Sequence, residues 1–323
     1  MPSINNLLGD LAFSETHYVL GRASIADLFR PGQRCGIYIL HFTNGEFYCG
    51  QSVDVTRRFA QHSKLHADIE KISFRQILQN DLNIEELSSI RILEAQGFRL
   101  RNIALTSIPF GPSDLDLIIT QNEQNRWCKD PSFVDYAGTR IIEPDLRRKY
   151  RQRFEQFIAL PYANETICFL RAYAHSCLPA VRRTEVSFWS CSCLPGNTNP
   201  DTEILARVNI YWQEVLTIGA HKEELFFSLH LADKPLITNQ LTTKLFQWKY
   251  KISRDEHQYK PGGQDQTHLV VDGTANALAF IKTKLFLQAV RVFNIRLMKK
   301  GACTSGRYHC LDLADQIVPN EEQ

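Results

Sequence analysis

The stretch GIYILHFTNGEFYCG, residues 36–50, predicts a β-hairpin, because apolar and aromatic residues flank the turn-forming pair Asn44-Gly45. One tyrosine lies on each predicted strand, Tyr38 on the first and Tyr48 on the second. A two-residue loop would place the two tyrosines on opposite faces of the sheet. A three-residue loop, residues 43–45 with Gly45 left-handed, would bring them onto one face. Both tyrosines are also consistent with ordinary strand positions, since aromatic residues favour strands.

The next segment, SVDVTRRFAQH at 52–62, predicts a helix capped by Ser52 or Asp54. The spacing i, i+3, i+4, i+7 puts four of its residues on one face: Val55, Arg58, Phe59 and His62. The apolar pair must be the buried part of that face. Arg58 at its edge needs an anionic partner or ligand, unless it forms a surface salt bridge or extends its charge into solvent.

A strand is predicted to begin near Ile69. The segment 83–102 then predicts a helix that opens at Asn83. Ile90 and Leu93 stand four and seven residues after Glu86, so Glu86 borders the packed face of that helix. Gly97 ends the helix, and Asn102 comes five residues later.

Taken in this order, residues 34–105 resemble the GIY-YIG nuclease family. GIY at 36–38 and YCG at 48–50 match the two halves of its name motif, and Arg58 and His62 stand where its helix carries arginine and histidine. Glu86 best matches the family's metal-ligand glutamate, with Glu85 and Glu94 as alternatives, and Asn102 matches its later asparagine. Gln51 departs from the lysine that several members carry.

The resemblance implies a metal-dependent endonuclease that hydrolyses phosphodiester bonds in DNA. It implies that Glu86 holds Mg²⁺ or another divalent cation and that Arg58 stabilises the phosphate. Tyr38 or Tyr48 would position or activate water, His62 would relay a proton or hold the phosphate, and Asn102 would orient its neighbours. The alternative is a catalytically inactive nucleic-acid-binding or scaffold protein that retains the fold. Since two tyrosines in one site require a shared face, we predict the three-residue loop, and we expect Gly36 and Gly50 to let a nucleic-acid backbone approach.

The predicted fold class is α+β: a three-stranded antiparallel sheet flanked by helices, plus a larger mixed α+β C-terminal domain. We divide the chain into an N-terminal lead (1–33, with a short helix at 23–29), a nuclease-like domain (34–106), a linker (107–116) and a C-terminal domain (117–323). In the last we expect helices at 144–158, 202–216 and 275–300, and strands in EVSFWSCSC and LFFSLHLA.

Basic residues of the C-terminal domain are candidates for contacts with double-stranded DNA. The segment DLRRKYRQRF, 145–154, holds five of them: Arg147, Arg148, Lys149, Arg151 and Arg153. The alternative is a solvated helix face. Arg182 and Arg183, and the basic residues of 282–300, are further candidates.

The composition is that of a folded protein: 44% of the 323 residues are hydrophobic and 22% charged. With a net charge of +2, any nucleic-acid surface must be a local basic patch. No apolar run is long enough to span a membrane, and the N-terminus does not resemble a secretory signal. Nine scattered cysteines predict a reducing, cytoplasmic setting. Buried thiols are the expected state of Cys191, Cys193, Cys303 and Cys310; a zinc site formed with His309 is the alternative.

Overall fold

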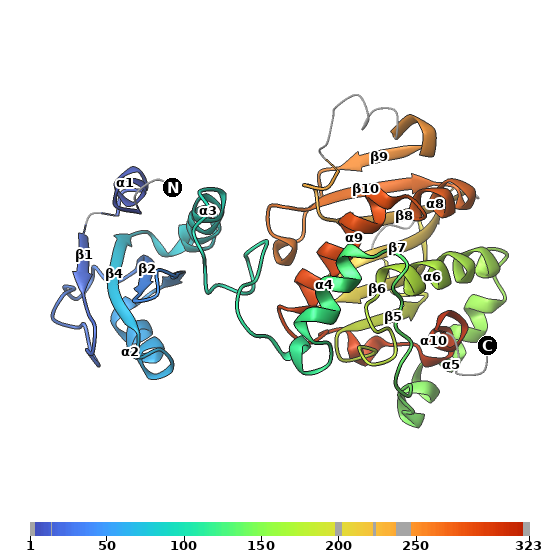
Figure 1. Ribbon diagram of the computed structural model, residues 1–323, viewed down its shortest axis with the longest axis horizontal. Coiled ribbons are helices and arrows are strands. Elements are labelled where there is room, and N and C mark those ends of the chain that lie inside the picture. The colour runs from blue at the N-terminus through green and yellow to red at the C-terminus, as the bar shows by residue number, and fades with distance from the viewer. Residues whose placement is uncertain (1–3, 14, 198–201, 222–223, 237–246, 319–323) are drawn as a thin grey trace. The chain divides into compact units, whose positions relative to one another are not determined.

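The computed structural model describes residues 4–13, 15–197, 202–221, 224–236 and 247–318 (Figure 1). The chain forms two compact units, Met1–Gly111 (unit 1) and Pro112–Gln323 (unit 2). The division falls inside residues 107–116, the predicted linker. Each unit combines helices with an antiparallel sheet, so the α+β class is confirmed. No helix within the described ranges is both long and apolar enough to cross a membrane.

Unit 1 contains a four-stranded sheet in the order β1-β4-β2-β3, one strand more than predicted. Its strands are β1 (Glu15–Tyr18), β2 (Gly36–Phe42), β3 (Phe47–Ser52) and β4 (Ile69–Gln76). The additional strand, β1, comes from the lead and pairs antiparallel with β4. The predicted helix at 23–29 is wrong, since turns occupy this segment. The guanidinium of Arg34 donates hydrogen bonds to the carbonyl oxygens of Ala26 and Phe29, at 3.1–3.2 Å, and so holds these turns together.

The helices of unit 1 are α1 (Ile4–Asp10), α2 (Val55–Leu65) and α3 (Leu82–Ala95), with the 3₁₀ turn η1 (Gln79–Asp81) before α3. Asp54 caps α2, as one of the two predicted alternatives requires, by accepting from the backbone N–H groups of its first turn. Asn83 lies inside the first turn of α3 rather than at its cap. The apolar residues of α2 pack with Tyr38 and Leu40, whereas those of α3 pack with Ile37 and Ile39. The two helices therefore cover opposite faces of the sheet.

Unit 2 contains a six-stranded antiparallel sheet in the order β5-β6-β7-β8-β10-β9. The strands are β5 (Trp189–Cys193), β6 (Glu203–Ile210), β7 (Gln213–His221), β8 (Glu224–Leu231), β9 (Ile252–Asp255) and β10 (Thr267–Asp272). The helices are α4 (Gln121–Lys129), α5 (Pro144–Ile158), α6 (Ala163–Cys177), α8 (Thr274–Ile281), α9 (Lys284–Met298) and α10 (Leu311–Ile317), with 3₁₀ turns η2 (Asp114–Leu117), η3 (Lys260–Gly262) and η4 (Gly306–Tyr308). The predicted helix at 144–158 and the two predicted strands are confirmed as α5, β5 and β8.

Two other predictions for unit 2 are wrong. Residues 202–216 form the β6–β7 hairpin rather than a helix. Its turn is Tyr211-Trp212, with Tyr211 left-handed at φ 57°. The single helix expected over 275–300 is two helices, because Thr283 adopts an extended backbone and its side chain caps α9.

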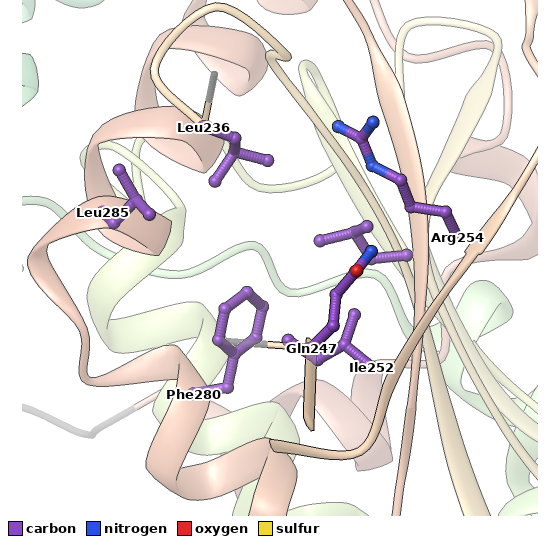
Figure 2. Close-up of a pocket in the computed structure, with 7 residues that line it drawn as sticks. Leu236, Gln247, Ile252, Arg254, Phe280 and Leu285 are labelled. Carbon is purple, nitrogen blue, oxygen red and sulfur yellow. The ribbon is translucent and has the colours of Figure 1, made fainter. Parts of the chain in front are cut away.

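The unit 2 sheet has one apolar and one polar face. Partners across the strands share a face, so one row reads Cys191, Val208, Leu216, Leu229 and Leu269, and the next reads Ser192, Arg207, Thr217 and Ser228. Helices α6, α8, α9 and α10 pack against the sheet, where the apolar row joins their core (Figure 1). Figure 2 shows a pocket of about 30 Å³ lined by Ile252, Phe280 and Leu285. It has room for about one water molecule and none for a substrate.

Candidate active site

The β2–β3 hairpin brings Tyr38 and Tyr48 onto one face, as predicted. Tyr38 pairs with Gly50, and Leu40 pairs with Tyr48. The loop contains three residues, Thr43-Asn44-Gly45, and Gly45 is left-handed at φ 79°. The ring centroids of the two tyrosines lie 6.1 Å apart.

Gly50 allows both phenol rings to lie against the strand. A Cβ atom at this position would stand 2.5 Å from Tyr38 Oη and 2.8 Å from Tyr48 Cε1. At Gly36, a Cβ would stand 2.0 Å from the backbone oxygen of Arg75. The expectation that these glycines leave room for a nucleic-acid backbone is therefore wrong, because atoms of the protein already fill that space.

The phenol oxygen of Tyr38 connects two side chains of α2. Arg58 Nε lies 3.3 Å from it and His62 Nε2 lies 2.9 Å from it. A guanidinium can only donate, so the oxygen accepts from Arg58. The tautomer of the imidazole decides whether Tyr38 or His62 donates in the other bond. Burial, together with the charge of Arg58, lowers the pKa of His62 to about 4, which keeps the imidazole neutral near pH 7.

The two phenols differ in exposure. Tyr38 is 1% exposed, whereas Tyr48 is half-buried. Burial raises the pKa of both, and Arg58 acts against that rise at both. Water can therefore reach Tyr48 more readily than Tyr38, and Arg58 is the group that favours a phenolate at either position.

The three candidate glutamates of α3 have different surroundings. Glu85 pairs with Arg75 at 2.6 Å, and Glu94 accepts from the backbone N–H of Ser107 at 2.8 Å. Glu86 accepts from Gln51 Nε2 at 3.0 Å, and its charge raises the pKa of both phenols. Of the three, Glu86 is the carboxylate that acts on both tyrosines.

Asn102 holds the backbone of β3 from its outer edge. Its Nδ2 donates to the carbonyl oxygen of Cys49 at 2.6 Å, and its Oδ1 accepts from the N–H of Cys49 at 2.9 Å. Both bonds are buried, and Cys49 lies between Tyr48 and Gly50. Asn102 thus positions the tyrosine-bearing strand through its backbone.

Sequence reasoning missed His66, whose ring stacks on that of His62 with centroids 6.2 Å apart. The predicted helix, 52–62, ends at His62, so the spacing of four residues to His66 was a signal only for a longer helix. His66 places a second imidazole beside the bonded pair Tyr38 and His62.

No three His, Cys, Asp or Glu side chains gather as a metal-binding group in the part of the chain that the structure describes. The cysteines of the alternative zinc site are buried, and Cys193 Sγ lies 3.4 Å from Cys310 Sγ. His309 is held by Glu185 and by the backbone N–H of Cys191.

The basic residues of α5 do not form one uniform surface. Arg147 is paired with Asp312 and, at 2.7 Å, with Asp315 of α10. The other four differ: Arg148 pairs with Asp145, Lys149 lies over the ring of Tyr150, Arg151 approaches Asp312 at 3.8 Å, and Arg153 forms no ion pair with any described residue. Of the five basic residues, Arg147 and Arg148 are thus ion-paired within unit 2, whereas Arg153 is available to a ligand.

Four arginines among the other basic candidates of unit 2 are used inside the fold, whereas Lys282 and Lys284 are exposed. Arg291 is 1% exposed, and Arg296 pairs with Asp265 at 2.6 Å. Arg182 donates to the carbonyl oxygen of Tyr136, and Arg183 pairs with Asp135. These arginines support the structure of unit 2.

Comparisons of this chain with protein-family models, curated proteins and solved structures give no match. Function is therefore inferred from the residues of the site.

Proposed function

We propose that unit 1 is a metal-dependent endonuclease that hydrolyses phosphodiester bonds in DNA. The observation that carries the proposal is the state of Arg58. Its guanidinium is exposed, is held by Tyr38 and Gln61, and forms no ion pair with a carboxylate in the described part of the chain. An arginine fork fixed in this way is suited to the non-bridging oxygens of a phosphate.

The two tyrosines then take different roles. Tyr48, the more accessible phenol, positions and deprotonates the attacking water, while Arg58 favours its phenolate form. Tyr38, buried and bonded to both Arg58 and His62, holds the guanidinium in place. The bond between Tyr38 and His62 keeps the phenol oxygen beside Arg58.

Glu86 would hold the divalent cation, with Gln51 steadying its carboxylate. When bound, Mg²⁺ would supply Lewis-acid stabilisation of charge on the phosphate and the leaving oxygen. We further propose that unit 2 directs the enzyme to double-stranded DNA and that the protein acts in the cytoplasm, where its nine free cysteines would stay reduced.

The test measures nicking of a supercoiled plasmid in two parallel reactions, one with Mg²⁺ and one with EDTA. Arg58→Ala should slow cleavage about 10²–10³-fold, the usual effect of removing one preorganised donor to a developing charge. Arg57→Ala is the matched control: Arg57 is the adjacent, exposed arginine of α2, and its side chain forms no hydrogen bond or ion pair with any described residue of the site. It should cleave at the wild-type rate.

A second pair of variants tests the glutamate. Glu86→Gln should abolish Mg²⁺-dependent cleavage, whereas Glu85→Gln should lose only the ion pair with Arg75 and remain active. If the wild-type protein cleaves neither DNA nor RNA with any divalent cation, the alternative of an inactive nucleic-acid-binding protein replaces this proposal.

A further inference from the structure

Unit 2 has a pocket of about 400 Å³ at the β5 edge of its sheet, where α5 and η4 stand beside that strand. Six of the residues that line it are Arg153, Ser192, Arg207, Asn209, Glu214 and Tyr308. Ser192 pairs with Arg207 across β5 and β6, and Asn209 pairs with Glu214 across β6 and β7. The polar face of the sheet thus forms the floor of the pocket.

The two arginines of the pocket are in different states. Arg207 pairs with Glu214 at 3.3 Å, and its Nε is buried without a hydrogen-bond partner among the described residues. Arg153 reaches the pocket from α5 and forms no ion pair with a described residue. Its guanidinium carbon lies 6.0 Å from the centroid of the Tyr150 ring. The pocket therefore offers one uncompensated positive charge and one donor–acceptor pair.

An aromatic ring borders the same space. Tyr308 is 45% exposed, although large aromatic side chains are usually buried. Tyr150, 6% exposed, anchors the wall behind it by donating its O–H to the carbonyl oxygen of Arg307 at 2.9 Å. An accessible ring on a fixed support is a stacking surface for a planar ligand.

We propose that this pocket binds one nucleotide unit. Arg153 takes the phosphate, because it is the cation without a counter-ion. The Arg207–Glu214 pair meets the edge of the base, which carries both acceptors and donors, and the base stacks on Tyr308. The volume is within the range of small-molecule sites. This inference rests on the proposed function for its biological purpose, target recognition by the nuclease, whereas the binding itself does not require cleavage.

The bound unit has two possible sources, a free nucleotide or a nucleotide turned out of a DNA strand. Binding to the full chain is measured in EDTA, so that no cleavage occurs. One arm titrates the deoxynucleoside 5′-monophosphates by calorimetry. The other follows a short fluorescein-labelled oligonucleotide, single- and double-stranded, by anisotropy.

Arg153→Ala and Tyr308→Ala should each weaken binding about 10- to 100-fold, and Tyr308→Phe should retain it. Arg148→Ala is the control from the same helix, since the Arg148 side chain is 79% exposed and paired with Asp145. An effect in the calorimetric arm identifies a free nucleotide; an effect confined to the oligonucleotide identifies a nucleotide within a strand. If neither arm responds to Arg153→Ala and Tyr308→Ala, the proposal is wrong.

The plasmid assay separates this proposal from the previous one. If binding depends on Arg153 and Tyr308 but the wild-type protein does not cleave, the nuclease proposal is wrong and the nucleotide pocket is supported. If the protein cleaves but shows no such binding, the nuclease proposal is supported and the nucleotide pocket is wrong.

Discussion

Two arginines that both border an apolar helix stripe have opposite roles in the two units. Arg291 of α9 is 1% exposed, and its guanidinium donates to the backbone oxygens of Trp127, Asp130, Pro131 and Ser176. Arg58 of α2 is exposed and is held by a phenol and an amide. The difference shows that the acceptors around an arginine, and not its place on a helix, decide whether its guanidinium is buried in the fold or stays exposed.

The largest expected effect tests the structural member of this pair. Arg291→Ala should lower the free energy of unfolding of unit 2 by about 3–5 kcal/mol, because buried carbonyl oxygens lose their donor and a cavity forms. Arg58→Ala should change stability by less than about 0.5 kcal/mol, as an exposed substitution. Tryptophan fluorescence during urea unfolding follows unit 2 for Arg291→Ala, since the four tryptophans, at 127, 189, 212 and 248, all belong to it. Scanning calorimetry of the unit 1 transition follows Arg58→Ala. Equal stability of the two variants would contradict the comparison.

The two hairpins show what the sequence could predict. The β2–β3 turn has Gly45 at its left-handed position, which is the residue type that this conformation favours. The β6–β7 turn places Tyr211 in the same region, where a large side chain is uncommon, so no turn signal interrupts residues 202–216. The helix predicted over 202–216 is wrong because Ala206, Val208 and Ile210 alternate as the buried residues of a strand do.

The candidate site also contains features that the sequence predicts and features that it does not. Strand register limits the loop to two alternatives, and helix spacing places Arg58 at the edge of a packed face. The family resemblance, which requires both tyrosines in one site, selects the three-residue loop that brings Tyr38 and Tyr48 together. The clamp of Asn102 on Cys49 joins residues 53 apart, and the ion pairs of Arg147 with α10 join residues more than 160 apart. No local pattern encodes such distant contacts, so the sequence does not predict that Arg147 is paired within the fold.

A substitution of intermediate effect tests whether the shared face of the tyrosines matters. Gly50→Ala should cost about 1–3 kcal/mol of stability in unit 1, because the new methyl group overlaps both phenol rings. The displaced rings should also reduce Mg²⁺-dependent cleavage strongly. The plasmid assay and scanning calorimetry measure the two effects.

Gly45→Ala is the matched control on the same hairpin. A Cβ there meets nothing within 4 Å, so only the positive φ of 79° opposes it, at about 1 kcal/mol. Its cleavage rate should match that of the wild type. If Gly50→Ala cleaves as fast as Gly45→Ala, the close approach of the two phenols is not needed for the reaction.

The smallest expected effect is a pH dependence that belongs to unit 1. Burial lowers the pKa of both His41 and His62 to about 4, with Lys71 adding to the effect at His41 and Arg58 at His62. Between about pH 6.5 and 4 the unfolded chain binds protons at these histidines and the folded chain does not, so stability falls as the pH decreases through this window. We expect a loss of about 1–2 kcal/mol, measured as the calorimetric melting temperature of unit 1 at successive pH values.

His62→Gln should make this dependence shallower, since glutamine does not titrate, while Asp and Glu residues contribute equally to both proteins. The same slope in both would mean that folding does not lower the pKa of His62.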